Sequence, residues 1–402
     1  MQVPVPKQFE QACDILKRME LNGHKAYFVG GCLRDWLLGR PIGDIDIATS
    51  AHPQTVQQMF EKVIPVGLQH GTVIVRYDQQ SYEVTTFRVE DDYSDQRHPD
   101  AVQFVQTIDQ DLQRRDFTIN ALAMNRHGIM IDPFNGKEDL EKGLICTVGN
   151  SYERFREDPL RILRALRFSS QLGFQIEEAT LTAMNTLNAG IATIAVERIA
   201  QETAKFFEGQ YINTGMHYFK TIALSGYLPI LKDYPAITGR IPQHMKSLKS
   251  FGAVIALFHW IEPAIPIQEW VKQWKCSNQI KHDASALAEA LSYYHSKGLD
   301  HWLVYSLDAN VYSDFCRLVN ILLTEDLSAY AVRQIEASLP IHSKKDLEID
   351  GTELRRVFPA YEPGRWIGRT LDQLEKQVVT GQLANRQETL KEWLKCNPPV
   401  IT

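Results

Sequence analysis

Apolar and polar positions change their spacing several times along the first part of the chain. Between Val5 and Leu21 the apolar side chains recur at helical spacing, which predicts an amphipathic helix. Ala26–Val29 is a short apolar run that predicts a strand. After a pair of glycines, Leu33, Trp36 and Leu37 return to helical spacing. The chain therefore begins with a predicted helix, strand, tight turn and helix, in this order.

The next segment combines a short helix with strand-like runs. Pro53 suits the first turn of a helix, and the apolar positions after it continue the helical spacing. Thr72–Tyr77 and Tyr82–Phe87 are rich in β-branched and aromatic residues and flank a polar turn, so we expect a β-hairpin. Arg88–Asp100 is densely charged and has no apolar period, which predicts a solvated loop.

Strand-like alternation almost disappears after Tyr152, and helical spacing continues to the C-terminus. Clusters of proline and glycine, such as Pro263–Pro266, mark joints between helical blocks. The pattern predicts an α+β portion that closes near residue 145, followed by an all-helical remainder.

Composition adds few constraints. A chain of 402 residues suggests two to four modules, and its formal charge of −6 means that any nucleic-acid binding depends on local basic clusters. Its six cysteines are scattered without zinc-binding spacing, which is typical of reduced thiols. We find no apolar signal core and no run of transmembrane length. These observations predict a cytoplasmic protein with no membrane segment, and they leave open whether it is a homodimer.

Two adjacent motifs carry candidate chemistry. The first is the glycine pair Gly30–Gly31 with Arg34 in the helix that follows. Glycines at a strand-to-helix turn let backbone N–H groups approach a phosphate, and a guanidinium in the first helical turn can reach the same anion. Asp44 and Asp46 follow at i and i+2, a spacing that places both carboxylates on one face of a strand.

Paired carboxylates repel each other unless a cation lies between them, and metal-assisted phosphoryl transfer uses such a pair. An isolated Asp-x-Asp is more often a solvated strand edge. Here the glycine–arginine turn just upstream favours a metal site at Asp44 and Asp46. Arg114 and Arg115 stand ahead of an expected apolar helix and offer bidentate ligands for a triphosphate.

A polar stripe is predicted on one helix after residue 157. Asp158, Arg161, Arg164 and Arg167 recur every third residue. Such a stripe is often a solvated face with internal ion pairs. An aspartate acceptor beside an arginine donor also matches the edges of cytosine and adenine, each of which presents an amino donor beside a ring acceptor. Uracil and guanine present the reverse order and would be rejected.

These motifs together resemble a known family. Phe28–Gly31, Arg34–Asp35 and Asp44–Asp46 are similar to the signature of class II tRNA nucleotidyltransferases and bacterial poly(A) polymerases, which belong to the polymerase-β-like superfamily. Arg114–Ala121 matches the family's RRDFTxNA motif, and Glu157–Arg161 resembles its EDxxR motif. The resemblance is strong to about residue 170 and weaker between residues 205 and 340.

The resemblance implies a fold and a set of roles. It implies an α+β fold: a polymerase-β-like nucleotidyltransferase head with a small mixed β-sheet at residues 1–145, then an all-α neck (146–205), body (206–280) and tail (281–402), with the tail binding tRNA. The implied catalytic carboxylates are Asp44 and Asp46, which hold Mg²⁺, with Glu83 as the third. Gly31, Arg34 and Arg115 would hold triphosphate or ribose. Asp158 and Arg161 would read the base, with Arg164 and Arg167 near base, ribose or phosphate.

The activity implied is template-independent addition of CCA to the tRNA 3′ end from CTP and ATP. The resemblance also gives the Arg88–Asp100 loop a part in the change from cytidine to adenosine addition, and its full length argues against a CC-only enzyme. An A-adding enzyme, a CC-adding enzyme or a poly(A) polymerase remain alternatives. An inactive RNA- or nucleotide-binding homologue is the alternative outside enzymes, and the intact carboxylates at Asp44 and Asp46 disfavour it.

Overall fold

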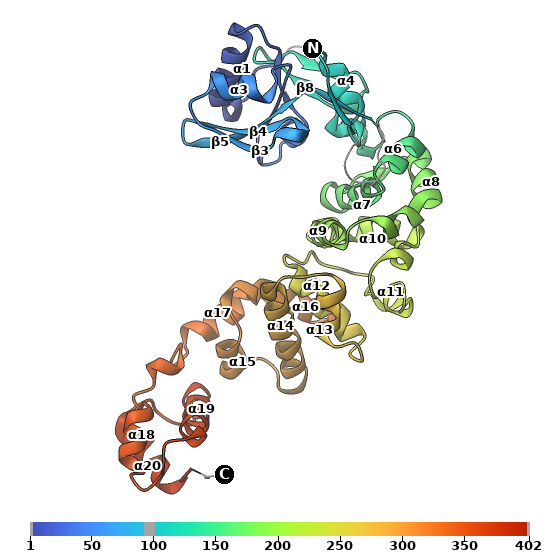
Figure 1. Ribbon diagram of the computed structural model, residues 1–402. Helices are drawn as coiled ribbons and strands as arrows, with labels where there is room; N and C mark the ends of the chain where they lie inside the picture. Colours follow the sequence, from blue (N-terminus) through green and yellow to red (C-terminus); the bar gives the residue numbers. More distant parts are fainter. Residues whose placement is uncertain (1–2, 92–100, 400–402) are drawn as a thin grey trace. The chain divides into compact units, whose positions relative to one another are not determined.

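The computed structural model describes residues 3–91 and 101–399. The chain forms two compact units, Met1–Gly239 and Arg240–Thr402, which are described separately (Figure 1). The first unit contains the β-sheet and the helices that follow it. The second unit is helical throughout its described residues. The observed α+β class, with a small mixed sheet and two further two-stranded sheets in the described residues, confirms the fold predicted from sequence.

The main sheet has seven strands in the order β3-β4-β5-β2-β1-β8-β9. β2 and β5 run parallel, and every other neighbouring pair in this sheet is antiparallel. The predicted hairpin is present, with Asp78 and Gln79 at its turn, both with positive φ. The strands are β1 (Ala26–Val29), β2 (Asp46–Thr49), β3 (Val63–Gly67), β4 (Thr72–Tyr77), β5 (Gln80–Thr86), β8 (Ala123–Met124) and β9 (Met130–Ile131).

One face of this sheet is covered by helices. Strand register aligns Phe28, Ile47, Val84 and Val73 in a single buried row across β1, β2, β5 and β4. The Phe9 ring packs edge-on against Phe28 with ring centroids 4.8 Å apart. Phe9 lies just before α1 (Glu10–Leu21), and α1 and α3 (Pro53–Met59) lie on this side (Figure 1). The alternation of apolar residues along each strand is what fixes this face as the core.

The other face of the sheet has an apolar part, covered by α4, and a polar part that carries the carboxylates. At the β1–β2 end, Val29 and Ala48 are buried in a cluster with Phe87 and with Ile108 and Leu112 of α4 (Ile108–Gln113). Beyond β2, the same face carries Asp46 and Glu83 and no comparable apolar cover in the described residues. This apolar cluster therefore packs directly beside the polar side chains of the sheet.

Two local predictions need correction. Asp44 lies in the segment before β2, so the two aspartates do not share a strand. Arg88–Asp91 is not loop: it forms strand β6, which pairs with β7 (Ala101–Phe104). Residues 92–100, the rest of the predicted loop, lie outside the described residues.

Helices complete the first unit. α7 (Leu160–Leu172) packs against α9 (Val196–Phe207) and α10 (Ile212–Thr221), and α6 (Ser151–Glu157) precedes it. Pro159 separates α6 from α7, and a proline disfavours helical backbone in the residue before it. Asp158 accordingly is extended, with φ −141° and ψ 99°. Asp158 therefore precedes α7, and only Arg161, Arg164 and Arg167 of the predicted stripe lie on that helix.

The second unit is built from α12 to α20. α12 is buried along almost its entire length and packs against α14. No described helix combines the length and the apolar character needed to cross a membrane. The helices are α12 (Phe251–Ile261), α13 (Ile267–Gln273), α14 (Asn278–Lys297), α15 (His301–Ser306), α16 (Tyr312–Leu322), α17 (Ala329–Ala337), α18 (Gly351–Val357), α19 (Arg365–Val379) and α20 (Gln387–Cys396).

Candidate active site

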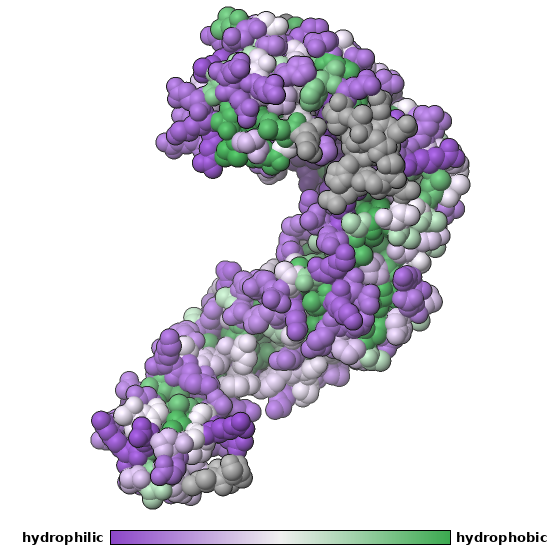
Figure 2. Space-filling view, viewed as in Figure 1, coloured by the Kyte–Doolittle hydropathy of each residue, from purple (hydrophilic) through white to green (hydrophobic). Residues whose placement is uncertain are grey.

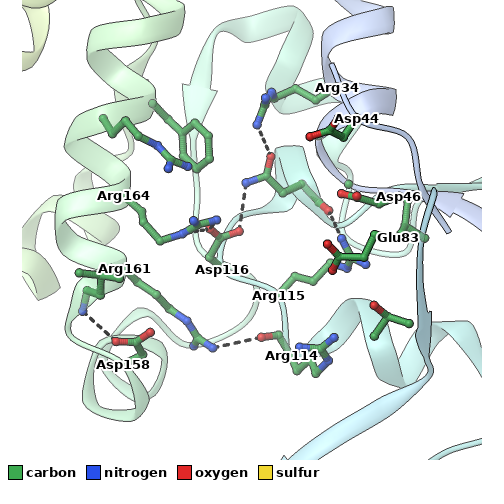
Figure 3. Close-up of a pocket in the computed structure, with 18 of the residues that line it drawn as sticks. Arg34, Asp44, Asp46, Glu83, Arg114, Arg115, Asp116, Asp158, Arg161 and Arg164 are labelled. Carbon is green, nitrogen blue, oxygen red and sulfur yellow. Dashed lines mark hydrogen bonds and ion pairs between the residues drawn. The ribbon is translucent and has the colours of Figure 1, made fainter. Parts of the chain in front are cut away.

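A cleft of about 810 Å³ in the first unit gathers the predicted functional residues. Its lining carries nine basic and five acidic side chains. Figure 3 shows the carboxylates of the sheet facing the arginines of α7 across this cleft. All ten residues predicted from sequence line it: Gly31, Arg34, Asp44, Asp46, Glu83, Arg115, Asp158, Arg161, Arg164 and Arg167.

The glycine turn after β1 lets an arginine approach the backbone. Gly30 has φ 76° and ψ −131°, a conformation that side-chain-bearing residues rarely adopt. A Cβ atom at Gly30 would lie 2.7 Å from Nη1 of Arg115. The backbone angle therefore favours glycine, and a side chain here would displace the end of the Arg115 guanidinium. The turn leads into α2 (Gly31–Leu37), which carries Arg34.

Arg34 is held in place by three neighbours. Its Nη1 donates to Oδ1 of Asn120 at 2.7 Å, and its Nε and Nη2 donate to the Asp35 carboxylate at 3.0 Å each. The guanidinium also lies 5.0 Å from the centre of the Phe168 ring. These contacts fix the direction of the guanidinium toward the cleft, so an anion that binds there meets a positioned charge.

Arg114 and Arg115 directly follow α4, and the apolar helix expected after them is the short 3-10 helix η3 (Thr118–Asn120). Both donate to Asp111, with N–O distances of 3.0 Å for Arg114 and 3.2 Å for Arg115. Burial opposes the ionisation of Asp111, but the two guanidinium groups lower its pKa below its usual range. Nε of Arg115 is buried and has no hydrogen-bond partner in the described part of the chain. One donor of this arginine is therefore available for a ligand.

The three carboxylates come together through strand register. Asp46 on β2 and Glu83 on β5 are directly opposite each other in the parallel pair, so their side chains share a face. Burial raises the pKa of Asp46 to about 6, and the charges of Glu83 and Asp44 act in the same direction. The site therefore concentrates negative charge that a cation would relieve.

We tested whether this donor set fits the magnesium ion implied by the sequence. Among residues 3–91 and 101–399, no three or more His, Cys, Asp and Glu side chains form a ready-made metal cage. Mg²⁺ is commonly held by one or two carboxylates, with water and substrate phosphates as its other ligands. Asp44 and Asp46 supply hard oxygen donors of this kind beside a triphosphate-sized cleft, so the residues present fit the ion.

Asp116, the aspartate of the RRDFTxNA motif, connects the head to α7. Its carboxylate accepts a hydrogen bond from Arg164 Nε at 2.7 Å (Figure 3), and further hydrogen bonds from Phe117 N at 2.8 Å and Asn120 Nδ2 at 3.0 Å. Burial alone would raise the pKa of Asp116, but Arg164 and the hydrogen bonds hold it well below its usual range. Asn120 in turn accepts from Arg34, so one network spans α2, the Asp116 segment and α7.

Asp158 and Arg161, the two residues expected to read the base, are not paired with each other. Asp158 Oδ2 pairs with Arg198 Nη2 at 2.9 Å, and Arg161 Nη1 donates to Glu157 Oε2 at 2.6 Å. Arg161 Nη2 also donates to the backbone oxygen of Arg114 at 3.2 Å. Only 7% of Arg161 is exposed, which excludes the alternative of a solvated surface stripe at this position. Each member of the expected pair is positioned by a different neighbour.

Arg164 and Arg167 share one acidic partner. Glu202 on α9 lies 3.0 Å from Arg167 Nη1 and 3.9 Å from Arg164 Nη1. Burial lowers the pKa of Arg167 to about 10, with Arg164 acting in the same direction. Nε of Arg167 is buried without a partner in the described residues. Buried positive charge in excess of local acids favours binding of an anion.

Sequence reasoning missed the residues of α9. Arg198 and Glu202 are four residues apart, so they lie on one face of the helix. Glu202 is buried, which is rare for an unpaired glutamate and is explained by its arginine partners on α7. The only indication in the sequence was that these two charged residues stand at i and i+4 in an amphipathic helix. The same spacing is equally common on solvent-exposed helices, so it does not identify a site.

Three family models match the chain. A Poly A polymerase head-domain model matches residues 26–146, and a model of a putative tRNA nucleotidyltransferase domain 2 matches residues 248–394. Residues 173–234 match a model described as a probable RNA- and SrmB-binding site of polymerase A. The matches follow one another along the chain and cover most of its length.

Curated proteins and solved structures that resemble this chain include several CCA-adding enzymes. The CCA-adding enzyme of Oceanobacillus iheyensis is 46% identical over 396 residues, which cover 98% of this chain and 99% of that protein. The CCA-adding enzyme of Enterococcus faecalis is 38% identical, with 97% of each chain covered. The crystal structure of Bacillus stearothermophilus CCA-adding enzyme in complex with CTP has a TM-score of 0.86 at 33% identity, with 98% of each chain covered.

Proposed function

The chain belongs to the family of CCA-adding enzymes, and on this premise we propose that it adds CCA to the 3′ end of tRNA from CTP and ATP, without a nucleic-acid template and with release of pyrophosphate. The observation that carries the proposal is the cleft in which the carboxylates of β2 and β5 face the arginines of α7. The six cysteines are free thiols, which supports a cytoplasmic location.

Asp44 and Asp46 would hold Mg²⁺, with Glu83 as the third carboxylate. When bound, the ion supplies Lewis-acid stabilisation of the attacking and leaving oxygens. The β2–β5 register fixes the Asp46 and Glu83 carboxylates relative to each other, so two of the three oxygen donors are in place before the substrates bind. Strands suit this role because the backbone that carries Asp46 and Glu83 is held by hydrogen bonds to neighbouring strands on both sides.

The triphosphate would lie against the positive side of the cleft. Gly31, Arg34 and Arg115 flank the carboxylates at the end of β1, and the unpartnered Nε of Arg115 supplies a free donor. Charge-assisted hydrogen bonds from arginine to phosphate are short and directional. The developing charge on the pyrophosphate would thus meet donors that are already in place, which lowers the reorganisation needed during transfer.

Base selection would use Asp158 and Arg161 as separately held groups. Arg198 holds the Asp158 carboxylate as an acceptor, and Glu157 with the Arg114 carbonyl orients the Arg161 guanidinium. An acceptor and a donor in fixed positions match the amino group and ring nitrogen of cytosine or adenine. The protein would then replace the template strand, with Arg164 and Arg167 close to base, ribose or phosphate.

Incubation with tRNA that ends at the discriminator base tests the proposal. CTP, ATP or both are supplied, and the products are sequenced. Addition of CC with CTP alone and of CCA with both nucleotides is the expected result. Addition of only A, of only CC or of a long poly(A) tail would assign one of the narrower activities. Binding without incorporation would identify an inactive homologue.

Replacing Arg161 by alanine should weaken discrimination against UTP and GTP as well as slow correct addition. A missing partner in a desolvated pocket costs about 1–3 kcal/mol, which changes the ratio of specificity constants roughly 5- to 150-fold. Asp158→Ala should relax selection in the same sense, because a carbonyl oxygen would no longer be repelled. The measurement is kcat/KM for the four nucleoside triphosphates, together with the melting temperature.

Arg156→Ala is the matched control for these variants. Arg156 lies on α6, is exposed and does not line the cleft. Its removal should leave all four specificity constants unchanged. Unaltered C-to-U and A-to-G ratios in Arg161→Ala, with a lowered melting temperature, would make Arg161 a structural residue.

A further inference from the structure

The row of residues that contains Asp46 and Glu83 continues across the sheet. Glu83 on β5 is opposite Ile74 on β4, and Ile74 is opposite Ile64 on β3. Directly opposed residues in neighbouring strands project from the same face. Asp46, Glu83, Ile74 and Ile64 therefore form one line that starts at the carboxylates and ends at the edge strand. With strands about 5 Å apart, Ile74 lies ~5 Å and Ile64 ~10 Å beyond Glu83.

The far end of this line is apolar and exposed. Ile64 is 44% and Val66 62% exposed, although β3 lies beside the active-site strands. The register shifts between Pro65 and Gly67, which makes Val66 the extra residue of a β-bulge. Figure 2 shows hydrophobic residues gathered on the first unit over β3 and β4. Exposed apolar residues that cluster next to a functional cleft mark an interaction surface more often than isolated ones do.

The active site needs two substrates on opposite sides of its carboxylates. The strand order places the Gly30–Gly31 turn of β1 on one side of β2, and β5, β4 and β3 on the other. The first side carries Arg34 and Arg115, which suit a triphosphate. The second side carries the paired hydroxyls of Thr72 and Thr85, 3.1 Å apart, and then the isoleucines. The second side, with hydroxyl and apolar side chains closest to the carboxylates, suits the substrate that brings a hydroxyl group.

We propose that Ile74, Ile64 and the bulged Val66 form a platform on which the single-stranded 3′-terminal nucleotides of the acceptor RNA dock, next to the reacting hydroxyl. The inference rests on the proposed function and extends it to a binding surface for the second substrate. Apolar side chains stack with any base, so the platform would hold each successive 3′ end of a growing CCA sequence without reading it. Thr72 and Thr85 would offer hydrogen bonds to the ribose closest to the carboxylates.

Two features disfavour a protein strand as the occupant. Pro65 lacks an N–H group, and the bulge at Val66 interrupts the regular edge, so β3 is a poor template for strand addition. Arg76 follows Ile74 on the same face of β4 and is exposed, which places a positive charge beside the apolar residues. An apolar surface flanked by a cation matches the bases and phosphates of a single strand.

The double variant Ile64→Ser/Val66→Ser tests the platform. We expect KM for tRNA to rise about tenfold, which corresponds to the loss of one stacked base, while KM for CTP and the melting temperature stay unchanged. Leu21→Ser is the matched control, because Leu21 on α1 is 78% exposed and far from the described row in sequence and on the helix-covered side. In addition, tRNA that carries 4-thiouridine next to its 3′ terminus should photocross-link to the peptide spanning residues 62–77.

An unchanged KM for tRNA, an equal rise in KM for CTP, or a cross-link to another peptide would overturn the platform. A change in oligomeric state of the double variant on gel filtration would assign the surface to a second copy of the chain instead. Failure of the wild-type protein to incorporate CTP or ATP would contradict the proposed function itself. The cross-link is formed before any incorporation, so it distinguishes the two failures.

Discussion

Asp46→Asn should abolish the incorporation of both nucleotides and, without metal, make the protein more stable. The loss of activity follows from the role proposed for Asp46 as a metal ligand, because an amide is a far weaker ligand for Mg²⁺ than a carboxylate. The gain in stability follows from the crowding of negative charge at Asp46. Burial and the charges of Glu83 and Asp44 raise the pKa of this carboxyl to about 6. A residue that only maintained the fold would show the opposite change in stability.

The sign of the stability change depends on pH. Because the folded-state pKa of Asp46 lies above the unfolded value, the protonated carboxyl is favoured by folding at low pH. The contribution of Asp46 to the free energy of unfolding is complete below about pH 4 and is lost as the pH rises through about 6. Above pH 6 the ionised wild-type protein should be less stable than Asp46→Asn, by on the order of 3 kcal/mol.

Thermal unfolding in EDTA from pH 4 to pH 8 measures this difference, and CTP incorporation with Mg²⁺ measures activity. The difference in melting temperature should be small at pH 4 and reach its full size above pH 6. Glu141→Gln is the control, since Glu141 is 68% exposed on α5 (Gly136–Lys142), away from the cleft. If Asp46→Asn retained more than a few per cent of activity, or lost stability at pH 8, the metal assignment would be wrong.

Asp116→Ala should destabilise the first unit by about 3–5 kcal/mol, because it leaves Arg164 without its closest counter-charge. The same change removes the acceptor of Asn120, which positions Arg34, so nucleotide binding should also weaken. Folding lowers the pKa of Asp116. The contribution of this carboxylate to stability is therefore complete above its unfolded pKa, about 4, and is lost as the pH falls from there toward its folded pKa. Urea unfolding at pH 7 measures the loss of stability.

The double variant Asp116→Ala/Arg164→Met separates the ion pair from other causes. Replacing both partners of a buried pair by apolar groups is often nearly neutral, so the double variant should recover most of the lost stability. It should not recover nucleotide binding, because Arg34 would still lack its positioned partner. Additive losses in the double variant would show that Asp116 acts mainly through Phe117 and Asn120.

Local chemistry made the head predictable from sequence. β1 has the predicted bounds Ala26–Val29, because a short apolar run ends at the glycines that β-strands avoid. The β4–β5 hairpin follows from its polar turn, and the family resemblance indicates Glu83, on its second strand, as the third carboxylate. The parallel pairing that places Glu83 opposite Asp46 joins residues 37 positions apart, and only the resemblance suggested it.

Partner choice among charged residues could not be predicted. Asp158 and Arg161 are close in sequence, yet Pro159 turns the chain between them and each pairs with a different residue. Arg198 and Glu202 approach α7 only because α9 packs beside it, which depends on the tertiary arrangement. Sequence spacing therefore identified which residues reach the cleft, and packing decided which of them touch.

Because Asp46 and Glu83 meet through strand register, the chain should tolerate changes in its length unevenly. One residue inserted between Tyr82 and Glu83 would reverse the facing of the following part of β5, which would bury a charge and expose a valine. A residue inserted at Asp78–Gln79 would only lengthen the hairpin turn and leave the β2–β5 alignment unchanged. Insertions and deletions that survive in this fold should therefore concentrate in that turn and be absent from β5.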